Sequence, residues 1–324
     1  MVDLQERQAA AATAAASPAI HCVELTKHYG HTVALAGLTM TVPRGEVFGF
    51  LGPNGAGKTT AVKLLLGLLE PTGGEGWVLG RPLGEVAVRR RVGYLPELFR
   101  YQPWLRGGEV LRVHCELARL PRGAWPAETA RVLDLVGLGD RAGDRVRTYS
   151  KGMQQRLGLA VALVAEPEVI FLDEPTSALD PVGRRDVREV LRALKGRGAT
   201  VFLNSHMLSE VEQVCDRVAV VDSGRVVALG TLADLIGGPK RVRIGVESLS
   251  AECTAAAARF GEVERADATS IVIGGVDAAR IPDVVATLVA TGARIVSVAP
   301  ESQTLEDRFL SLLRKPDDAD PDLR

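Results

Sequence analysis

A glycine-rich stretch, Gly52-Pro53-Asn54-Gly55-Ala56-Gly57-Lys58-Thr59-Thr60, decides the fold of this 324-residue chain. It follows the apolar run at residues 47–51 and precedes the apolar run at residues 61–69, so its context is strand, loop, helix. Because the glycines lack a Cβ, such a loop can close its backbone N–H groups around phosphate oxygens, and the helix adds the positive end of its dipole. The stretch therefore predicts a nucleoside triphosphate site.

Three side chains of the loop have distinct predicted roles. The ammonium group of Lys58 reaches the terminal phosphates, the hydroxyl of Thr59 holds Mg²⁺, and the hydroxyl of Thr60 bonds a phosphate oxygen. The alternative is a chance match in a glycine-rich chain, which should occur in roughly one chain in a hundred. The strand before the loop and the helix after it disfavour that alternative.

The composition indicates a folded globular protein, since 46% of the residues are apolar. The net charge of −1 shows no excess of basic residues of the kind that marks a nucleic-acid-binding face. No apolar run is long enough to predict a membrane-spanning helix.

The four cysteines lack metal-like spacing, which argues against a zinc site or a disulfide framework and fits a reducing cytoplasm. The Ala-rich residues 1–19 are interpreted as a disordered extension.

A second apolar run, at residues 169–172, delivers the adjacent carboxylates Asp173 and Glu174. In parallel sheets ligands bind at the carboxyl ends of strands, which is also where the phosphate loop lies. We therefore expect Asp173 to hold Mg²⁺ through water beside Thr59, and Glu174 to polarise the water that attacks the γ-phosphate. The alternative is a simple helix cap.

Three further residues are candidates for the same site. His206 follows the apolar run 199–203 and could bond the γ-phosphate or Glu174, whereas an isolated core histidine is the alternative. Glu97 follows the run 92–95 and is a candidate to reach the metal ion or its water. Tyr29 precedes the phosphate loop and could stack on adenine, although plain packing is the commoner reason for such a ring.

Residues 100–149 contain two amphipathic helical stretches and no strand pattern, which predicts a helical insertion in an α/β core. At its end Ser150 can cap an apolar helix. With Gly152 nearby, that helix start offers free N–H groups to an anion.

The linker Gly237-Gly238-Pro239 predicts a domain boundary, with the core at residues 20–236 and an accessory domain at 240–313. The second segment has the order β-α-β-β-α-β, which is typical of a small ferredoxin-like α+β unit, followed by an amphipathic helix. Residues 314–324 are rich in Asp and are interpreted as a disordered tail.

Taken together, these motifs resemble the ATP-binding subunit of an ABC transporter. The Walker A loop corresponds to residues 52–59, the Walker B strand to 169–173, and the D-loop to 177–180. By this resemblance Glu174 is the catalytic base, His206 the switch histidine and Tyr29 the adenine-stacking aromatic. The implied fold is an α/β P-loop NTPase (RecA-like) core with an antiparallel β subdomain and a helical subdomain.

Two positions depart from the commonest family pattern. Tyr149-Ser150-Lys151-Gly152-Met153 stands where the family signature reads Leu-Ser-Gly-Gly-Gln, and Glu97 stands where Gln is usual. Both departures resemble the branch of export ATPases that work with separate membrane subunits, whose members also carry a small C-terminal unit.

The resemblance implies a head-to-tail pair of ATPase subunits that holds two ATP molecules with Mg²⁺. Each ATP would lie between one Walker A loop and the helix start of the other chain at Ser150 and Gly152. The pair would sit on the cytoplasmic face of the membrane, bound to transmembrane subunits. Two alternatives stay open at this point, a soluble ABC-type ATPase acting on nucleic acid and an importer ATPase.

Overall fold

The structure is a computed structural model that describes residues 17–236, 241–301 and 304–313. The chain divides into two compact units at the Leu229–Gly230 bond. The expected linker at residues 237–239 and the expected tail at 314–324 lie outside the described residues, as does the expected extension up to residue 16. Ala19 corrects one detail of that extension, because it is buried and its N–H donates to the carbonyl of Val42.

The first unit is built on a six-stranded sheet with the order β10-β9-β3-β8-β7-β6. Strand β3 pairs in parallel with β8 and β9, and β7 pairs in parallel with β8 and β6. The carboxyl ends of β3, β8 and β7 therefore meet at one edge of the sheet. The strands are β3 (Val47–Leu51), β6 (Val92–Leu95), β7 (Val169–Asp173), β8 (Thr200–Asn204), β9 (Arg217–Asp222) and β10 (Arg225–Thr231).

The centre of this sheet is an aromatic cluster around Phe202 of β8. Its ring centroid lies 5.7 Å from that of Phe48, 5.1 Å from that of Phe50 and 5.2 Å from that of Phe171. All four rings are fully buried, and every residue of β3, β7 and β8 is buried. Strands buried on both faces explain the continuous apolar runs in the sequence.

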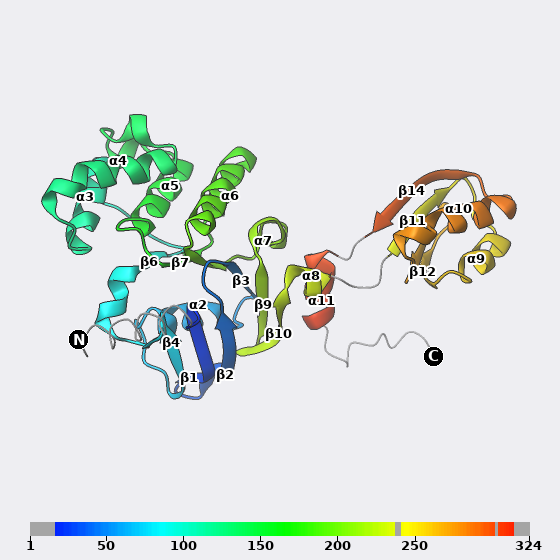
Figure 1. Cartoon of the computed structure of the whole chain (residues 1–324), viewed down its shortest axis with the longest axis horizontal. Helices are drawn as coiled ribbons and strands as arrows, with labels where there is room; N and C mark the ends of the chain where they lie inside the picture. The colour runs from blue at the N-terminus through cyan, green and yellow to red at the C-terminus, as the bar shows by residue number, and fades with distance from the viewer. Residues whose placement is uncertain (1–16, 237–240, 302–303, 314–324) are drawn as a thin grey trace, which may run out of the picture. The chain divides into compact units, whose positions relative to one another are not determined.

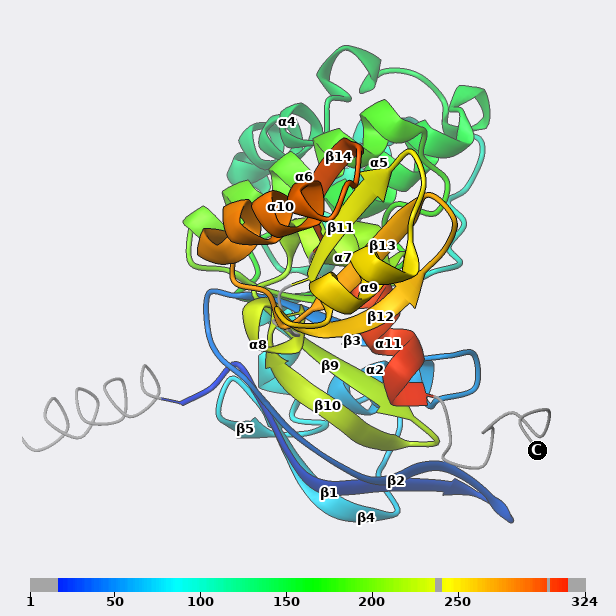
Figure 2. The ribbon, with the colours of Figure 1, turned by 90° about the vertical axis from the view of Figure 1, so that its right-hand side faces the viewer.

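A second, four-stranded sheet has the order β2-β1-β4-β5, and Figure 2 shows it below β9 and β10. Its strands are β1 (Ile20–Tyr29), β2 (Thr32–Val42), β4 (Gly73–Val78) and β5 (Arg81–Pro82). Helix α2 (Lys58–Leu65) packs in one core cluster with residues of both sheets. This sheet is the antiparallel subdomain implied by the family resemblance, and it positions the start of α2.

The helical part of the first unit comprises α3 (Gly107–Leu117), α4 (Trp125–Leu135), α5 (Lys151–Ala162) and α6 (Pro181–Gly196), drawn in green in Figure 1. Helices α3, α4 and α5 pack against one another. Apart from a bridge between Arg106 and Arg145, residues 100–149 form no strand, as expected. Helix α5 ends at Ala162. The shorter α7 (Leu208–Val214) follows β8.

The second unit contains a sheet with the order β12-β13-β11-β14 and helices α9 and α10. Its elements follow in the expected β-α-β-β-α-β order. They are β11 (Arg241–Val246), α9 (Ala251–Ala257), β12 (Glu262–Ala266), β13 (Ser270–Gly274), α10 (Ile281–Ala290) and β14 (Ile295–Glu301). Residues of β11, β13, α9 and α10 form one apolar core. The final helix α11 (Leu305–Leu313) packs against α8 (Leu232–Ile236).

Within the described ranges, no helix combines the length and the apolar character that crossing a bilayer requires.

Candidate functional site

The phosphate loop connects β3 to α2 and depends on two glycines with positive φ. Gly55 has φ +82° and Gly57 has φ +97°, a region that side chains with a Cβ rarely adopt. A Cβ on Gly57 would also collide with the carbonyl oxygen of Ala34. Because the N-cap of α2 is Gly57, no side chain caps the first N–H groups of the helix. These groups are therefore available to an anion.

Lys58 lies across this loop. Its Nζ donates to the carbonyl oxygens of Gly52 at 2.7 Å and Pro53 at 3.0 Å. Burial lowers the pKa of Lys58, and three carboxylates oppose that shift through their charge, those of Glu174, Asp173 and Glu97. In the structure Lys58 therefore lies close enough to the three predicted acids for their charges to act on it.

Glu174 follows the last residue of β7 and adopts a left-handed backbone conformation, with φ +52°. This conformation is uncommon for a residue with a long side chain and is held by neighbours. The N–H of Glu174 donates to the carbonyl of Asn204 at 2.9 Å. The Glu174 carbonyl accepts bonds from Ser177 Oγ at 3.1 Å and Gln155 Nε2 at 3.3 Å. The side chain is thereby turned toward the loop that follows β8.

His206 lies in that loop and contacts the Glu174 carboxylate. Oε1 of Glu174 accepts from the backbone N–H of His206 at 2.8 Å and from Nδ1 at 2.8 Å. Because a carboxylate only accepts, this contact assigns the proton to Nδ1. Oε2 of Glu174 is buried and accepts no hydrogen bond from a described residue. A buried carboxylate oxygen without a donor is suited to bind a water molecule.

The side chains expected at the metal are oxygen ligands. Asp173 is 3% exposed, and its Oδ1 accepts from Asn204 Nδ2 at 2.6 Å. Burial raises the pKa of Asp173, and the bond from Asn204 opposes that rise. Among the described residues no group of three or more His, Cys, Asp or Glu side chains could hold a metal ion by itself. One carboxylate and the Thr59 hydroxyl fit Mg²⁺, which usually takes few protein ligands and completes its shell with phosphates and water.

The two remaining candidates of this site are more exposed. Glu97 lies just beyond β6, and its charge also acts on Asp173 and Tyr94, which places it near the acids. Tyr29 is the last residue of β1 and is 47% exposed, with Lys27 Nζ 5.4 Å from its ring centroid. Glu97 stays a prediction as a contact of the metal ion or its water, and Tyr29 stays a prediction as the ring that stacks on adenine.

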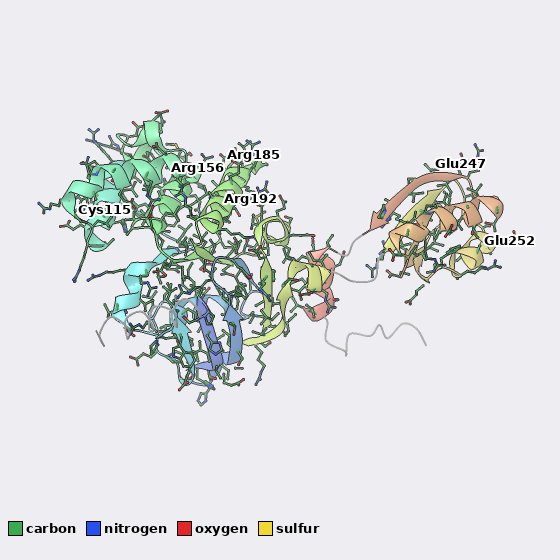
Figure 3. The ribbon with its side chains drawn as sticks, viewed as in Figure 1. Cys115, Arg156, Arg185, Arg192, Glu247 and Glu252 are labelled. Atoms are coloured by element: carbon green, nitrogen blue, oxygen red, sulfur yellow. The ribbon has the colours of Figure 1, made fainter. Side chains whose placement is uncertain are left out.

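Ser150 and Gly152 lie at the start of α5, where Ser150 Oγ accepts from Met153 N–H at 3.2 Å. They line a separate cavity of about 480 Å³ whose described lining includes no residue of the phosphate loop. Arg156 of α5, labelled in Figure 3, also lines this cavity and bonds Asp186 of α6 at 2.9 Å. This cavity therefore does not bring the start of α5 together with the phosphate loop of the same chain.

Two contacts of the site were not predicted from the sequence. Gln155 has no local pattern that points to the carbonyl of Glu174. Asn204 offered a signal, because it is a polar residue at the end of an otherwise apolar strand.

Known proteins resemble this chain in sequence and structure. Residues 35–177 match the family model described as ABC transporter. The ABC transporter ATP-binding protein all4389 of Nostoc sp. is 50% identical over 63% of this chain and 62% of its own length. The linearmycin resistance ATP-binding protein LnrL of Bacillus subtilis is 31% identical over 89% of this chain and 96% of its own length. A solved ATP-binding subunit of an ABC transporter is 31% identical, covers 67% of this chain and 91% of its own, and superposes with a TM-score of 0.62.

Proposed function

This chain belongs to the ABC transporter ATP-binding proteins, and we propose that it hydrolyses ATP at the edge where Lys58, Glu174 and His206 meet. The observation that carries this assignment is the bonding of Glu174. Both donors of His206 go to Oε1, and Oε2 stays buried without a donor. A carboxylate held in this way has one fixed oxygen and one oxygen free to take the proton of an attacking water.

The phosphate loop binds the triphosphate through its uncapped N–H groups and through Lys58, which exchanges its two carbonyl partners for phosphate oxygens. Thr59 is the direct protein ligand proposed for Mg²⁺, Asp173 would hold the ion through water, and Glu97 would reach the ion or its water. When bound, the ion neutralises charge on the β- and γ-phosphates. Thr60 bonds a phosphate oxygen, and Tyr29 stacks on adenine.

The active form is a head-to-tail pair in which each ATP also touches Ser150 and Gly152 of the second copy. The cavity at the start of α5 supports this arrangement, because its described lining includes no residue of the phosphate loop of the same chain, while the helix N-terminus can take an anion. Closure of the pair on ATP and its opening after hydrolysis would move the helical region around residues 100–149.

The pair drives export through separate membrane subunits, on the cytoplasmic face of the membrane. The supporting observation is the similarity to a resistance protein over nearly the whole of both chains. A pull-down of the tagged chain from detergent-solubilised membranes tests this step. An exporter-type permease should co-purify, whereas a solute-binding protein with an importer permease would contradict export.

The hydrolysis site is tested by phosphate release from Mg·ATP with the full chain. Glu174→Gln should lower turnover at least about a thousandfold, because the amide cannot accept the proton of water. Glu212→Gln, an exposed change of the same chemistry on α7, is the matched control and should keep full activity. Turnover by Glu174→Gln equal to that of the control would remove Glu174 from this role.

A further inference from the structure

Asn204 is the last residue of β8 and lies directly opposite Asp173, the last residue of β7, in the parallel pairing of the two strands. Paired residues of neighbouring strands present their side chains on the same face. Both residues are 3% exposed, and Asn204 Nδ2 donates to Asp173 Oδ1 at 2.6 Å. The Asn204 carbonyl accepts from the N–H of Glu174 at 2.9 Å. One residue of β8 therefore holds both neighbouring acids.

The bond to Asp173 meets a specific need of a buried carboxylate. An ionised carboxylate out of water is costly unless hydrogen-bond donors face it, and a bond to a charged group is worth more than a neutral one. Asn204 supplies a donor without adding a charge. No hydrogen bond from a described residue reaches Asp173 Oδ2, so the bond at Oδ1 fixes the orientation of the carboxylate and leaves its second oxygen available.

The other amide atom of Asn204 also matters. Oδ1 of Asn204 is buried and has no hydrogen-bond partner among the described residues. The orientation of the amide follows from its partner, because Asp173 Oδ1 can only accept and therefore faces Nδ2. Asn204 thus offers an unused acceptor beside the carboxylate, where a coordinated water would supply donors.

We infer that Asn204 is a positioning residue that holds the Asp173 carboxylate for the divalent ion and thereby sets the ion's affinity. The inference rests on the proposed role of Asp173. The inference separates ion binding from nucleotide binding. The hydrogen bonds described above join Asn204 to Asp173 and Glu174 and to no residue of the phosphate loop. Loss of its amide should weaken ion binding and leave nucleotide binding without the ion nearly unchanged.

The experiment measures Mn²⁺ binding to the full chain with ADP by electron paramagnetic resonance of the free ion. Asn204→Leu, which removes the donor at similar volume, should raise the dissociation constant of Mn²⁺ about tenfold or more. The half-saturating Mg²⁺ concentration in ATP hydrolysis should rise in parallel, with kcat at saturating Mg²⁺ within about threefold of the parent. The affinity for a fluorescent ATP analogue in EDTA should stay within about twofold.

A matched control is Thr200→Val on the same strand. Thr200 is 1% exposed, and its hydroxyl accepts from Gly45 N–H at 2.9 Å at the opposite end of β8. This variant loses a buried hydrogen bond of similar kind and should leave Mn²⁺ affinity unchanged. Equal weakening in Thr200→Val and Asn204→Leu would overturn the inference, as would unchanged Mn²⁺ affinity in Asn204→Leu.

An exchange variant covers the case in which Asn204→Leu does not fold. Asp173→Asn with Asn204→Asp restores one carboxylate and one amide with their places exchanged, and it should bind Mn²⁺ at least about fivefold more tightly than Asp173→Asn alone. No recovery in the exchange variant would count against the inference. If Asp173→Asn alone keeps the parent Mn²⁺ affinity, the proposed metal role of Asp173 fails as well, which distinguishes the two failures.

Discussion

His206 donates two hydrogen bonds to the same oxygen of Glu174, one from its backbone N–H and one from Nδ1, each 2.8 Å long. The two residues follow neighbouring strands, β7 and β8, so the sheet itself fixes the separation of their backbones. The Glu174 side chain is 9% exposed, whereas the imidazole of His206 is 66% exposed. The buried acid is therefore oriented by a group that solvent can still reach.

The pair predicts a specific effect of His206→Ala. Oε1 of Glu174 would keep the bond from the backbone N–H but lose the bond from Nδ1, so the carboxylate would be less firmly oriented. We expect kcat for ATP hydrolysis to fall about a hundredfold, with KM for ATP changed less than about threefold. Steady-state phosphate release over a range of ATP concentrations measures both values.

His206→Gln and His21→Ala refine this test. A glutamine amide can donate to the carboxylate, so His206→Gln should lose less than His206→Ala. His21 lies on β1 and bonds Thr41, so its replacement should leave kcat unchanged. Full activity of His206→Ala would show that the backbone bond alone is sufficient.

Glu174→Gln should also form dimers that depend on ATP. If Ser150 and Gly152 of a second copy complete each nucleotide site, blocked hydrolysis should keep the pair closed. Size-exclusion chromatography with light scattering should show dimers with Mg·ATP and monomers without nucleotide. Adding Gly152→Asp, which places a negative charge at the α5 helix start, should prevent the dimer. Dimers that persist in that double variant would contradict the proposed interface.

Lys58→Ala is expected to weaken nucleotide binding at least about tenfold, because a charge-assisted contact with the phosphates is lost. Titration with a fluorescent ATP analogue measures this affinity. Lys63→Ala is the matched control, since Lys63 is an exposed lysine of the same helix. Retained affinity in Lys58→Ala would disprove the assignment of the loop as the triphosphate site.

The central strands and the motifs that follow them could be predicted from the sequence, because each is recognisable from a short run of neighbouring residues. Strands β3, β7 and β8 are continuous apolar runs, since both faces of the central sheet are covered, and each is followed at once by a functional segment. The parallel pairing then brings those segments together without further information. The N-cap of α5 could also be predicted, because capping depends on a single residue, Ser150, next to the helix that it caps.

The sequence is less informative where the conformation of a segment depends on the strand with which it pairs. Gly73-Gly74-Glu75-Gly76 has the composition of a turn, but it forms most of β4, because it pairs with β1 across an irregular register that brings Gly74 close to the backbone of Glu24. Register shifts interrupt the pairing of β1 with β2, so no single run of the sequence marks the full length of either strand.

Long-range contacts were not accessible to pattern analysis. The short helix α8 was assigned to the ATPase core, yet it packs against α11 near the end of the chain. Asn204 directly follows the apolar run 199–203, but its bond to Asp173 depends on a cross-strand register that no single segment encodes.

Phe202→Ala tests the aromatic cluster of the central sheet. The ring is fully buried against three other phenylalanines, and removing it leaves a large cavity. We expect a loss of about 3–5 kcal/mol in the free energy of unfolding of the first unit. The tryptophans Trp77, Trp104 and Trp125 all lie in this unit, so their fluorescence during urea unfolding reports on it alone. A loss below about 1 kcal/mol would contradict the packing role of Phe202.

Glu168 lies just before β7 and joins two arginines. It pairs with Arg91 through both carboxylate oxygens and with Arg44 Nη1 at 3.2 Å. The hydrogen bonds from Arg91 are the main reason that the pKa of Glu168 lies below its ordinary value of 4.5, with Arg44 adding to the effect and burial opposing it. Because the pKa is lower in the folded state, the ionised carboxylate stabilises the fold. This stabilisation is complete above pH 4.5 and disappears as the pH falls through the folded-state pKa.

Glu168→Gln should therefore lower the free energy of unfolding at pH 7 by about 1 kcal/mol, a modest value because the side chain is 43% exposed and screened by water. The difference from the parent should narrow steadily below pH 4.5 and should shrink in 1 M salt, where exposed ion pairs are weakened. Urea unfolding followed by tryptophan fluorescence at several pH values measures the difference. Glu189→Gln, an exposed change on α6, should give no such dependence. If the free energies of unfolding of the parent and Glu168→Gln differ equally at pH 7 and pH 3.5, Glu168 acts through its shape rather than its charge.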